Sequence, residues 1–319
     1  MNRQIRLFSG NASNHLVPRI AELLSIDPSP AIVGRFNDGE VRIELQADVR
    51  GADVFIINST PPPAENFFEM MLLGKAARMA SAGRVTLVIP YLGYNRQDRK
   101  DRPRVPVAAK AAIETLKLTG ADRALLLDLH SEATAAHFEP MVTDHLYSSH
   151  AAVPYLHRVL NKSFVVASPD KGGTARALQY AQYLGQDDCV IFSKRRVAPG
   201  MVDKRIQIIG SVKNKDVLFV DDMIDTGGTM IADAEAAKKA GAKRIFAYAT
   251  HGILSGNALD NLSKSAFTQV FLTDTVLTPE KLSGKNGKFV LISVAPLLAQ
   301  AIRRIHQDES LSSLILKTK

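Results

Sequence analysis

The sequence predicts an α/β protein with mainly parallel sheets, and three observations support this. Short runs of β-branched and apolar residues recur along the whole 319-residue chain. Stretches rich in Ala, Leu and Met, each long enough for a helix, lie between several of these runs. Apolar residues make up 46% of the chain, which is enough to form a sizeable core. Continuous apolar strands that alternate with helices are typical of parallel sheets covered on both faces.

The expected elements follow one another in chain order. Short runs rich in β-branched and apolar residues predict buried strands at Ile5–Phe8, Ala31–Val33, Val54–Ile57, Val85–Ile89, Ala124–Leu127, Phe164–Ala167, Val217–Val220, Ile245–Ala249 and Phe289–Ile292. Helices are predicted at Asn66–Ala82, Val107–Leu118, Gly173–Leu184, Thr229–Ala240 and Ala295–Ile305.

The length of the chain suggests two domains, at roughly 150 residues for each. We place the boundary near residue 146, which gives domains 1–146 and 147–319. A faint repeat supports two similar halves. Gly120-Ala121-Asp122-Arg123 and Gly241-Ala242-Lys243-Arg244 each predict a helix stop followed by a strand, with a histidine ten residues after the glycine. The last helix can pack on either half.

The chain carries 40 Lys and Arg against 32 Asp and Glu, a net charge of +8. Nucleic acid is a poor match for this charge, because the chain has no Trp, 6% aromatic residues and no basic run interleaved with aromatics. Small phosphorylated substrates match better, since they need local clusters of cations. Two such clusters occur, at residues 96–104 and at Lys194-Arg195-Arg196, although either could be a solvated loop.

Cysteine use and hydropathy bear on the compartment. The single cysteine, Cys189, excludes an internal disulfide and any multi-cysteine metal site. No uncharged apolar run reaches the ~18 residues that a membrane-spanning helix needs. The first apolar stretch is only a few residues long, which does not predict a signal peptide. We therefore expect a cytoplasmic protein that does not bind membranes.

The strongest local signal is Val217-Leu-Phe-Val-Asp221-Asp222-Met-Ile-Asp225-Thr226-Gly227-Gly228-Thr229. An apolar strand ends in two carboxylates, and a loop with two glycines then opens a helix. In open α/β sheets ligands bind beyond the carboxyl ends of the strands, and a helix N-terminus attracts phosphate. The acids would repel that phosphate, so they are expected to accept hydrogen bonds from sugar hydroxyls or to hold Mg²⁺. Together these features predict a ribose-phosphate site.

Asp221–Thr229 resembles the phosphoribosyl-diphosphate binding loop of phosphoribosyltransferases and ribose-phosphate pyrophosphokinases. The order of the other motifs is similar to the pyrophosphokinases from end to end. These motifs are Phe36-Asn37-Asp38-Gly39-Glu40, Val49-Arg50-Gly51, Ser81-Ala82-Gly83-Arg84, Ile89-Pro90-Tyr91, Tyr94–Arg99, Asp128-Leu129-His130, Ser168-Pro169-Asp170 and Lys194-Arg195-Arg196. The chain thus looks like a class I ribose-phosphate pyrophosphokinase, built in that family from two phosphoribosyltransferase-like domains.

The resemblance implies that the β,γ-diphosphoryl group of ATP is transferred to O1 of ribose 5-phosphate, giving phosphoribosyl diphosphate and AMP. It assigns Asp221 and Asp225 to the sugar hydroxyls, and the 5-phosphate to Thr226, Gly227, Gly228 and Thr229. His130 and Asp170 are implied to bind Mg²⁺, completed by phosphate oxygens and waters. Taken alone, His130 is more often a buried core histidine, and His137, His145, His150 and His157 show no ligand spacing.

The resemblance also assigns ATP contacts. No Gly-x₄-Gly-Lys-Ser/Thr loop is present, so ATP has to be held in another way. Phe36, Asp38, Gly39 and Glu40 are implied to contact its adenine end. Arg96 and Gln97 are implied to bind the same nucleotide. Because the family's ATP site spans subunits, we expect a homo-oligomer, a homohexamer built from dimers.

Lys194 and Arg196 resemble the catalytic pair on the family's mobile loop, with Arg196 also contacting ribose 5-phosphate. Their positive charge is implied to stabilise the transition state. Ala198-Pro199-Gly200 follows directly, which favours a flexible loop.

The chain departs from the family pattern at three places: Asp48, the stretch Ala133–Glu139, and Lys171. In related enzymes several of these positions line an allosteric phosphate and ADP site between subunits. An aspartate there would weaken anion binding. We therefore expect activity to be retained and phosphate activation or ADP inhibition to be altered.

Two other functions remain open at this point. A phosphoribosyltransferase would explain Asp221–Thr229 but would leave Arg96, Gln97 and Lys194 without a role. A non-catalytic homologue that regulates a true synthase usually has an altered catalytic loop, whereas Lys194-Arg195-Arg196 is intact here.

Overall fold

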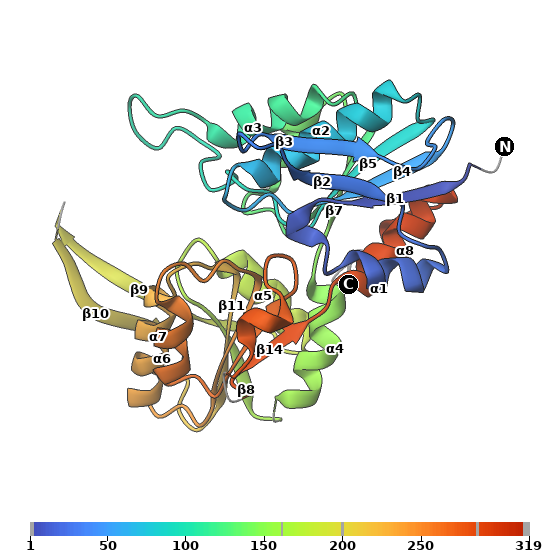
Figure 1. Ribbon diagram of the computed structural model, residues 1–319. Coiled ribbons are helices and arrows are strands. Elements are labelled where there is room, and N and C mark those ends of the chain that lie inside the picture. The colour runs from blue at the N-terminus through green and yellow to red at the C-terminus, as the bar shows by residue number, and fades with distance from the viewer. Residues whose placement is uncertain (1–2, 161, 199–200, 285–286, 315–319) are drawn as a thin grey trace. The chain divides into compact units, whose positions relative to one another are not determined.

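The computed structural model describes residues 3–160, 162–198, 201–284 and 287–314, without the side chains of residues 194–205. The chain divides into two compact units. Unit 1 comprises Met1–Ser148 together with Val294–Ile315, and unit 2 comprises Ser149–Ser293. Each unit contains a mainly parallel sheet flanked by helices, which confirms the predicted fold class (Figure 1).

Unit 1 is built on five parallel strands in the order β1-β4-β5-β6-β7. Their bounds are β1 (Ile5–Ser9), β4 (Asp53–Ile57), β5 (Arg84–Ile89), β6 (Arg123–Leu127) and β7 (Val142–Leu146). Every residue of β4 is buried, as expected for a strand whose two faces are both covered.

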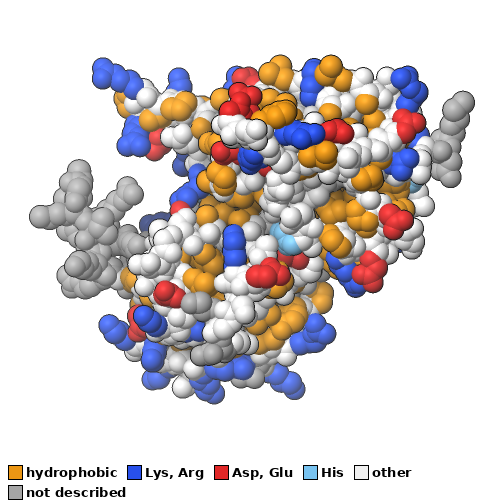
Figure 2. All heavy atoms as spheres, in the orientation of Figure 1, with side chains coloured by type: hydrophobic (Ala, Val, Ile, Leu, Met, Phe, Trp, Pro, Cys, Tyr) orange, Lys and Arg blue, Asp and Glu red, His pale blue; other side chains and the backbone are white. Residues whose placement is uncertain are grey.

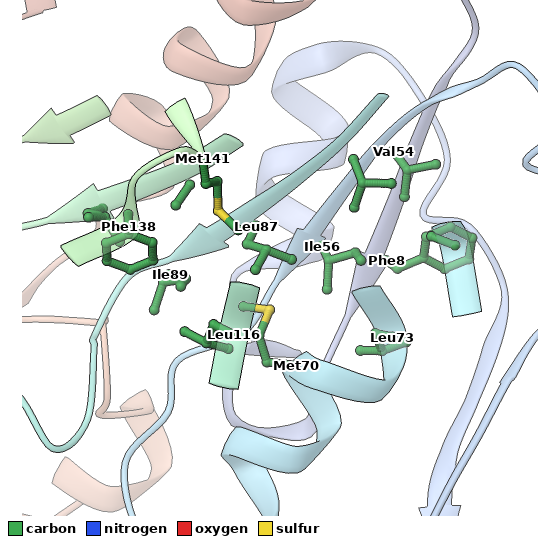
Figure 3. Close-up of a cluster of buried hydrophobic side chains, with 14 of the residues drawn as sticks. Phe8, Val54, Ile56, Met70, Leu73, Leu87, Ile89, Leu116, Phe138 and Met141 are labelled. Atoms are coloured by element: carbon green, nitrogen blue, oxygen red, sulfur yellow. The ribbon is translucent and has the colours of Figure 1, made fainter. Parts of the chain in front are cut away.

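The two faces of this sheet are packed by different helices. Val54 and Ile56 point toward α2 (Glu65–Met79) and α3 (Ala108–Lys117), where Met70, Leu73 and Leu116 complete the core shown in Figure 3. The alternate residues, Phe55 and Ile57, pack on the opposite face against α1 (Val17–Leu24) and α8 (Ala295–His306). This alternation follows from the two-residue period of a strand.

The last helix, α8, therefore belongs to unit 1, although it follows all of unit 2 in the sequence. Its side chains Leu297, Leu298 and Ile302 are buried. A polar network holds its C-terminal end. Arg84 donates to the carbonyl oxygen of Ile305 at 2.7 Å, and His306 Nδ1 lies 2.8 Å from Oδ2 of Asp53.

A two-stranded antiparallel hairpin, β2 (Ala31–Arg35) with β3 (Val41–Leu45), stands apart from the main sheet of unit 1. The sequence predicted Ala31–Val33 as a buried strand; it is a strand, but these residues are only half-buried. The partner strand was missed, because β3 alternates apolar and charged residues and has no continuous apolar run. The hairpin carries the turn Phe36–Glu40.

Unit 2 contains seven strands in the order β10-β9-β8-β11-β12-β13-β14, all parallel except β10. Their bounds are β8 (Phe164–Ser168), β9 (Cys189–Ala198), β10 (Met201–Ile209), β11 (Asp216–Ile224), β12 (Ile245–Gly252), β13 (Gln269–Thr273) and β14 (Phe289–Ile292). The helices α6 (Gly228–Lys239) and α7 (Ala258–Lys264) pack on one face, and α4 (Ser149–Val159) and α5 (Thr174–Tyr183) pack on the other.

All of the predicted strands and helices are present, but several elements were missed. The strands β7 and β10 interrupt their apolar residues with polar or charged ones. The strands β9 and β13 were missed although each contains a short apolar run, Cys189–Phe192 and Val270–Leu272. The missed helices α1 and α7 have only eight and seven residues, and α4 contains Pro154. No helix within the described residues is long and apolar enough to cross a membrane. Lys and Arg side chains are scattered over the face shown in Figure 2 and do not gather into one band.

Candidate active site

The turn Asp225–Gly227 joins β11 to α6 at the carboxyl edge of the sheet in unit 2. We predicted that the strand would end before Asp221; instead β11 continues to Ile224, so Asp221 and Asp222 lie within it. The strand continues because β12 still pairs with this stretch, with Asp221 aligned with Ala249 and Met223 with His251, although the pairing with β8 ends at Phe219.

The turn presents the start of α6 as an anion site. Gly227 has a φ of +73° at the residue before the helix, a left-handed conformation that favours glycine. Met230 is buried and fixes the first turn of the helix in the core. The partial positive charge at a helix N-terminus favours an anion beside the residues that follow Gly227. The side chains of Thr226 and Thr229 are exposed beside them.

Asp221 and Asp222 form a partly buried acidic pair with a cation that sequence reasoning missed. Arg176 of α5 places one guanidinium nitrogen 3.4 Å from Asp221 and 3.2 Å from Asp222. Burial, reinforced by repulsion from Asp222, raises the pKa of Asp221 to about 8, and Arg176 opposes this shift. A pair of partly buried carboxyl groups is a chemically suitable partner for neutral hydroxyl groups. No sequence signal identified Arg176, which lies 45 residues from Asp221.

The turn Phe36–Glu40 of unit 1 exposes a flat ring beside two carboxylates. Phe36 N–H donates to the carbonyl oxygen of Glu40 at 2.8 Å, Gly39 closes the turn with a φ of +95°, and Glu40 N–H donates to Oδ1 of Asp38 at 3.0 Å. The Phe36 side chain is 53% exposed, with Arg42 5.9 Å from its ring centre. An aromatic face next to carboxylate acceptors can stack on a nitrogenous base and bind its amino group.

Arg96 and Gln97 lie in the exposed segment between β5 and α3 of unit 1. The carbonyl oxygen of Gln97 accepts the N–H of Ala109 at 3.2 Å, which ties this segment to the start of α3. Asn95 beside them is buried. Both candidate side chains therefore reach solvent from an anchored backbone.

His130 and Asp170 each follow a strand by a few residues, in unit 1 and unit 2 respectively. Both side chains are exposed, which does not fit the alternative of a core histidine at position 130. Oδ1 of Asp170 accepts the N–H of Gly173 at 2.7 Å. In the described part of the chain, no group of three or more His, Cys, Asp and Glu side chains could hold a metal ion. A divalent cation at either residue would need further ligands from substrate or water.

The segment that carries His130 is held by residues to which sequence reasoning gave no role. Asp128 adopts a φ of +39° and accepts hydrogen bonds from the backbone N–H, at 3.0 Å, and the hydroxyl of Ser148. Leu129 N–H donates to Nε2 of His145 at 2.9 Å. His145 is therefore a structural acceptor.

Lys194 and Arg196 lie in β9, paired with Ile206 and Val202 of β10. The segment predicted as a loop is thus part of an antiparallel ribbon at the edge of the sheet in unit 2 (Figure 1). The backbone extends because β10 supplies the hydrogen-bonding partners that the sequence did not reveal. The side chains of both residues lie outside the described part of the structure.

The atypical Asp48 lies at a basic groove of about 1000 Å³ in unit 1, lined among others by Arg3, Arg6, Arg50, Arg84 and His306. Oδ1 of Asp48 accepts the backbone N–H of Arg50 at 3.0 Å. Of the other atypical positions, Lys171 is exposed, and residues 132–138 form a short 3₁₀ helix.

Comparison with known proteins gives matches along both units. A family model of the N-terminal domain of ribose phosphate pyrophosphokinase matches residues 5–120, and one of the phosphoribosyl synthetase-associated domain matches residues 162–316. Curated relatives include ribose-phosphate pyrophosphokinases of Haemophilus influenzae, 45% identical, and of Vibrio cholerae, 44% identical, each over 97% of this chain and 98% of the relative. The solved phosphoribosylpyrophosphate synthetase of Mycobacterium smegmatis aligns with a TM-score of 0.88 and 31% identity, over 96% of this chain and all of that one.

Proposed function

This chain belongs to the ribose-phosphate pyrophosphokinase family, and on that premise we propose how its own residues carry the family's reaction. The enzyme is an ATP-dependent diphosphotransferase. It transfers the β,γ-diphosphoryl group of ATP to O1 of ribose 5-phosphate and releases AMP, with 5-phosphoribosyl 1-diphosphate as product. A phosphoribosyltransferase, the second enzyme considered, is not favoured by these relatives.

Ribose 5-phosphate is proposed to bind at the turn between β11 and α6, and this turn is the observation that carries the assignment of roles. Its 5-phosphate would accept N–H and O–H donors from Thr226, Gly227, Gly228 and Thr229. Asp221 and Asp225 would accept hydrogen bonds from the sugar hydroxyls. The raised pKa of Asp221 means that less negative charge faces the phosphate.

ATP is proposed to bind through unit 1. The Phe36 ring would stack on adenine while Asp38 and Glu40 accept from its amino group, and Gly39 keeps the turn narrow. Arg96 and Gln97 would contact the same nucleotide from their exposed segment. We therefore propose that residues 1–146 bind the nucleotide and that residues 147–319 bind the sugar phosphate.

Mg²⁺ is proposed as the cofactor, with Asp170 and His130 as its protein ligands. Mg²⁺ prefers few protein carboxylates and keeps several waters or phosphate oxygens, so the isolated exposed carboxylate of Asp170 fits it better than it would fit a metal that needs a protein cage. When bound, the ion would neutralise phosphate charge. The chain's own residues would then hold the two substrates in the orientation that the transfer needs.

Lys194 and Arg196 are proposed to supply positive charge to the transferring group, with Arg196 also contacting the sugar phosphate. This assignment rests on their match to the family motif. We predict that Lys194→Ala lowers kcat by roughly 100-fold to 1000-fold with little change in the KM values, because the charge acts mainly in the transition state. Steady-state kinetics check this, with the exposed Lys213→Ala of the same unit as control. An equal fall in both variants, or a change in KM alone, would contradict the role.

The enzyme is also proposed to be a cytoplasmic homohexamer built from dimers and to respond weakly to phosphate or ADP. The acidic Asp48, in a groove whose lining includes four arginines, is the reason for the altered regulation. Sedimentation of the purified protein tests the assembly. A phosphate titration tests the regulation, and a strong phosphate requirement of the usual kind would refute it.

The decisive experiment measures AMP formation from ATP and Mg²⁺, with and without ribose 5-phosphate, at several phosphate concentrations. AMP that depends on the sugar is the expected result. If a folded oligomer binds ATP yet forms no AMP under any of these conditions, the alternative of a non-catalytic regulatory homologue replaces this proposal.

A further inference from the structure

We propose that Glu69 of α2 is a positioning residue for ATP, because it fixes the base of the β2–β3 turn that carries Phe36, Asp38 and Glu40. The inference rests on the proposed role of that turn in binding adenine. Glu69 itself touches no substrate in this proposal and acts through Arg35, the residue directly before Phe36.

Glu69 is a carboxylate with no exposed surface, and it joins three segments of unit 1. Its Oε2 accepts the backbone N–H of Asn11 at 2.9 Å, and its Oε1 accepts the side-chain amide of Asn11 at 2.8 Å. The same Oε1 accepts a guanidinium N–H of Arg35 at 3.0 Å. The loop after β1, the helix α2 and the end of β2 therefore meet at one buried acid.

The hairpin needs such an anchor. It forms its own two-stranded sheet and is tied to the five-stranded sheet near its base, where Ser29 N–H donates to the carbonyl oxygen of Leu7 at 2.8 Å, so no strand pairing with that sheet sets the direction of its far end. Its side chains Val33, Ile43 and Leu45 are only partly buried where they pack against the core. Apolar packing of this kind is not directional, whereas a carboxylate that pairs with a guanidinium fixes both distance and angle.

The contact is sensitive to a small chemical change. Both carboxylate oxygens of Glu69 face donor groups only, on Asn11 and Arg35. A glutamine at this position has one acceptor oxygen and one NH₂ group. In either orientation of the amide, the NH₂ group faces a donor and repels it. In both orientations Glu69→Gln removes the negative charge that pairs with Arg35, so it should loosen this contact with little change in the volume of the side chain.

Loss of the contact between Glu69 and Arg35 should weaken the binding of ATP and leave the binding of ribose 5-phosphate unchanged. Movement of Arg35 displaces Phe36 and the turn that follows it, and with them the proposed adenine contacts. The proposed sugar-binding residues Asp221–Thr229 lie in unit 2 and do not contact this hairpin through any part of the Glu69 network. Affinity for ATP should fall while affinity for ribose 5-phosphate is retained.

Steady-state kinetics of the whole enzyme test this with Glu69→Gln, Arg35→Met and the double variant. Each single variant should raise KM for ATP about tenfold, with KM for ribose 5-phosphate unchanged and kcat nearly so. The double variant should be no worse than either single one, because both remove the same contact. Glu22→Gln is the matched control, since Glu22 pairs with Arg19 on the exposed surface of α1 in the same unit.

Several results would overturn the inference. A fall in kcat and melting temperature with an unchanged KM for ATP would make Glu69 merely structural. Additive effects of Glu69→Gln and Arg35→Met would show that they do not share one contact. If Glu69→Gln does not fold, Arg35→Met carries the test alone, because the Arg35 side chain is 36% exposed.

Failure of the proposed function gives a different pattern. If the wild-type enzyme forms no AMP, calorimetric titration with ATP replaces the kinetics. Equal ATP affinity in the wild type and Glu69→Gln would then refute the positioning role, and weaker binding by the variant would support it.

Discussion

At the scale of single residues, the charge on Asp221 links the candidate site to stability. Burial and Asp222 raise its pKa well above the ordinary value of 3.8. The folded state therefore binds this proton more tightly than the unfolded state does. The free energy of unfolding must then fall as the pH rises from about 4 to about 8, and it stays at its lower value above that range.

Asp221→Asn is predicted to remove this penalty. Without ligands, its melting temperature should exceed that of the wild type by a margin that grows between pH 5 and pH 8, while binding of ribose 5-phosphate weakens. Thermal unfolding across this pH range checks the first part, with Glu22→Gln as a control that should show no such trend. A margin that shrinks toward pH 8 would contradict the raised pKa.

Gly93 illustrates a backbone constraint at the same scale. Its N–H donates to the hydroxyl of Thr60 at 2.8 Å, and a Cβ atom on Gly93 would lie 2.0 Å from the carbonyl oxygen of Thr60. We predict that Gly93→Ala lowers the free energy of unfolding by about 3 kcal/mol or more, because backbone must move. Urea unfolding measures this. Gly34→Ala, whose Cβ would meet nothing within 4 Å, should cost far less.

At the scale of elements, buried acids at the start of strands hold neighbouring elements together. Asp53 opens β4 and accepts hydrogen bonds from Arg84 Nε and a terminal guanidinium nitrogen at 2.8 and 2.5 Å, with His306 of α8 at 2.8 Å. Asp216 opens β11 in unit 2 and pairs in the same way with Arg244, before β12. The acid–arginine pair recurs at matching places in the two sheets.

Asp53→Ala is predicted to lower the free energy of unfolding by about 3 kcal/mol, because it leaves the mostly buried guanidinium of Arg84 with only the exposed Asp308, 2.8 Å away, as its counter-charge. Denaturant titration followed by circular dichroism measures the loss. Glu22→Ala, which breaks an exposed pair, is expected to cost less than about 1 kcal/mol. Similar losses in the two variants would show that the Asp53 network contributes little to the docking of α8.

Elements also show what the sequence could predict. Continuous apolar runs located β4, β5, β8 and β11, because strands covered on both faces need apolar residues throughout. The predicted helix stops at Gly120 and Gly241 are confirmed, with φ of +74° and +89° before β6 and β12. Strands whose apolar residues alternate with polar or charged ones were not predicted, because their burial depends on partners that are distant in the chain.

The same limit applies to the site. Asp221–Thr229 could be predicted because its chemistry is contained in nine successive residues. The roles of Arg176 and Glu69 could not be predicted, because each depends on a contact with a residue that lies 45 or 34 positions away in the sequence. For the same reason, the sequence did not reveal which of the two halves of the chain α8 packs on. Its apolar stripe is visible in the sequence, but its partner surface is not.

At the scale of the whole molecule, unit 1 is assembled from two separate segments, whereas the described residues of unit 2 all lie between Ser149 and Ser293. We predict that a chain ending at Ser293 aggregates, because the sheet face around Phe55 and Ile57 loses the cover of α8. Residues 149–293 expressed alone should remain folded. Limited proteolysis and light scattering of both fragments check this, and a monomeric, protease-resistant chain ending at Ser293 would disprove it.

This discontinuity sets an order for events on the ribosome. Residues 1–148 emerge first, but one face of their sheet stays uncovered until α8 leaves the exit tunnel. Translation of the intervening segment takes roughly ten to thirty seconds at about 5–20 residues per second. The half of the enzyme made first is thus the half finished last, and nascent chains expose apolar surface to chaperones throughout that interval.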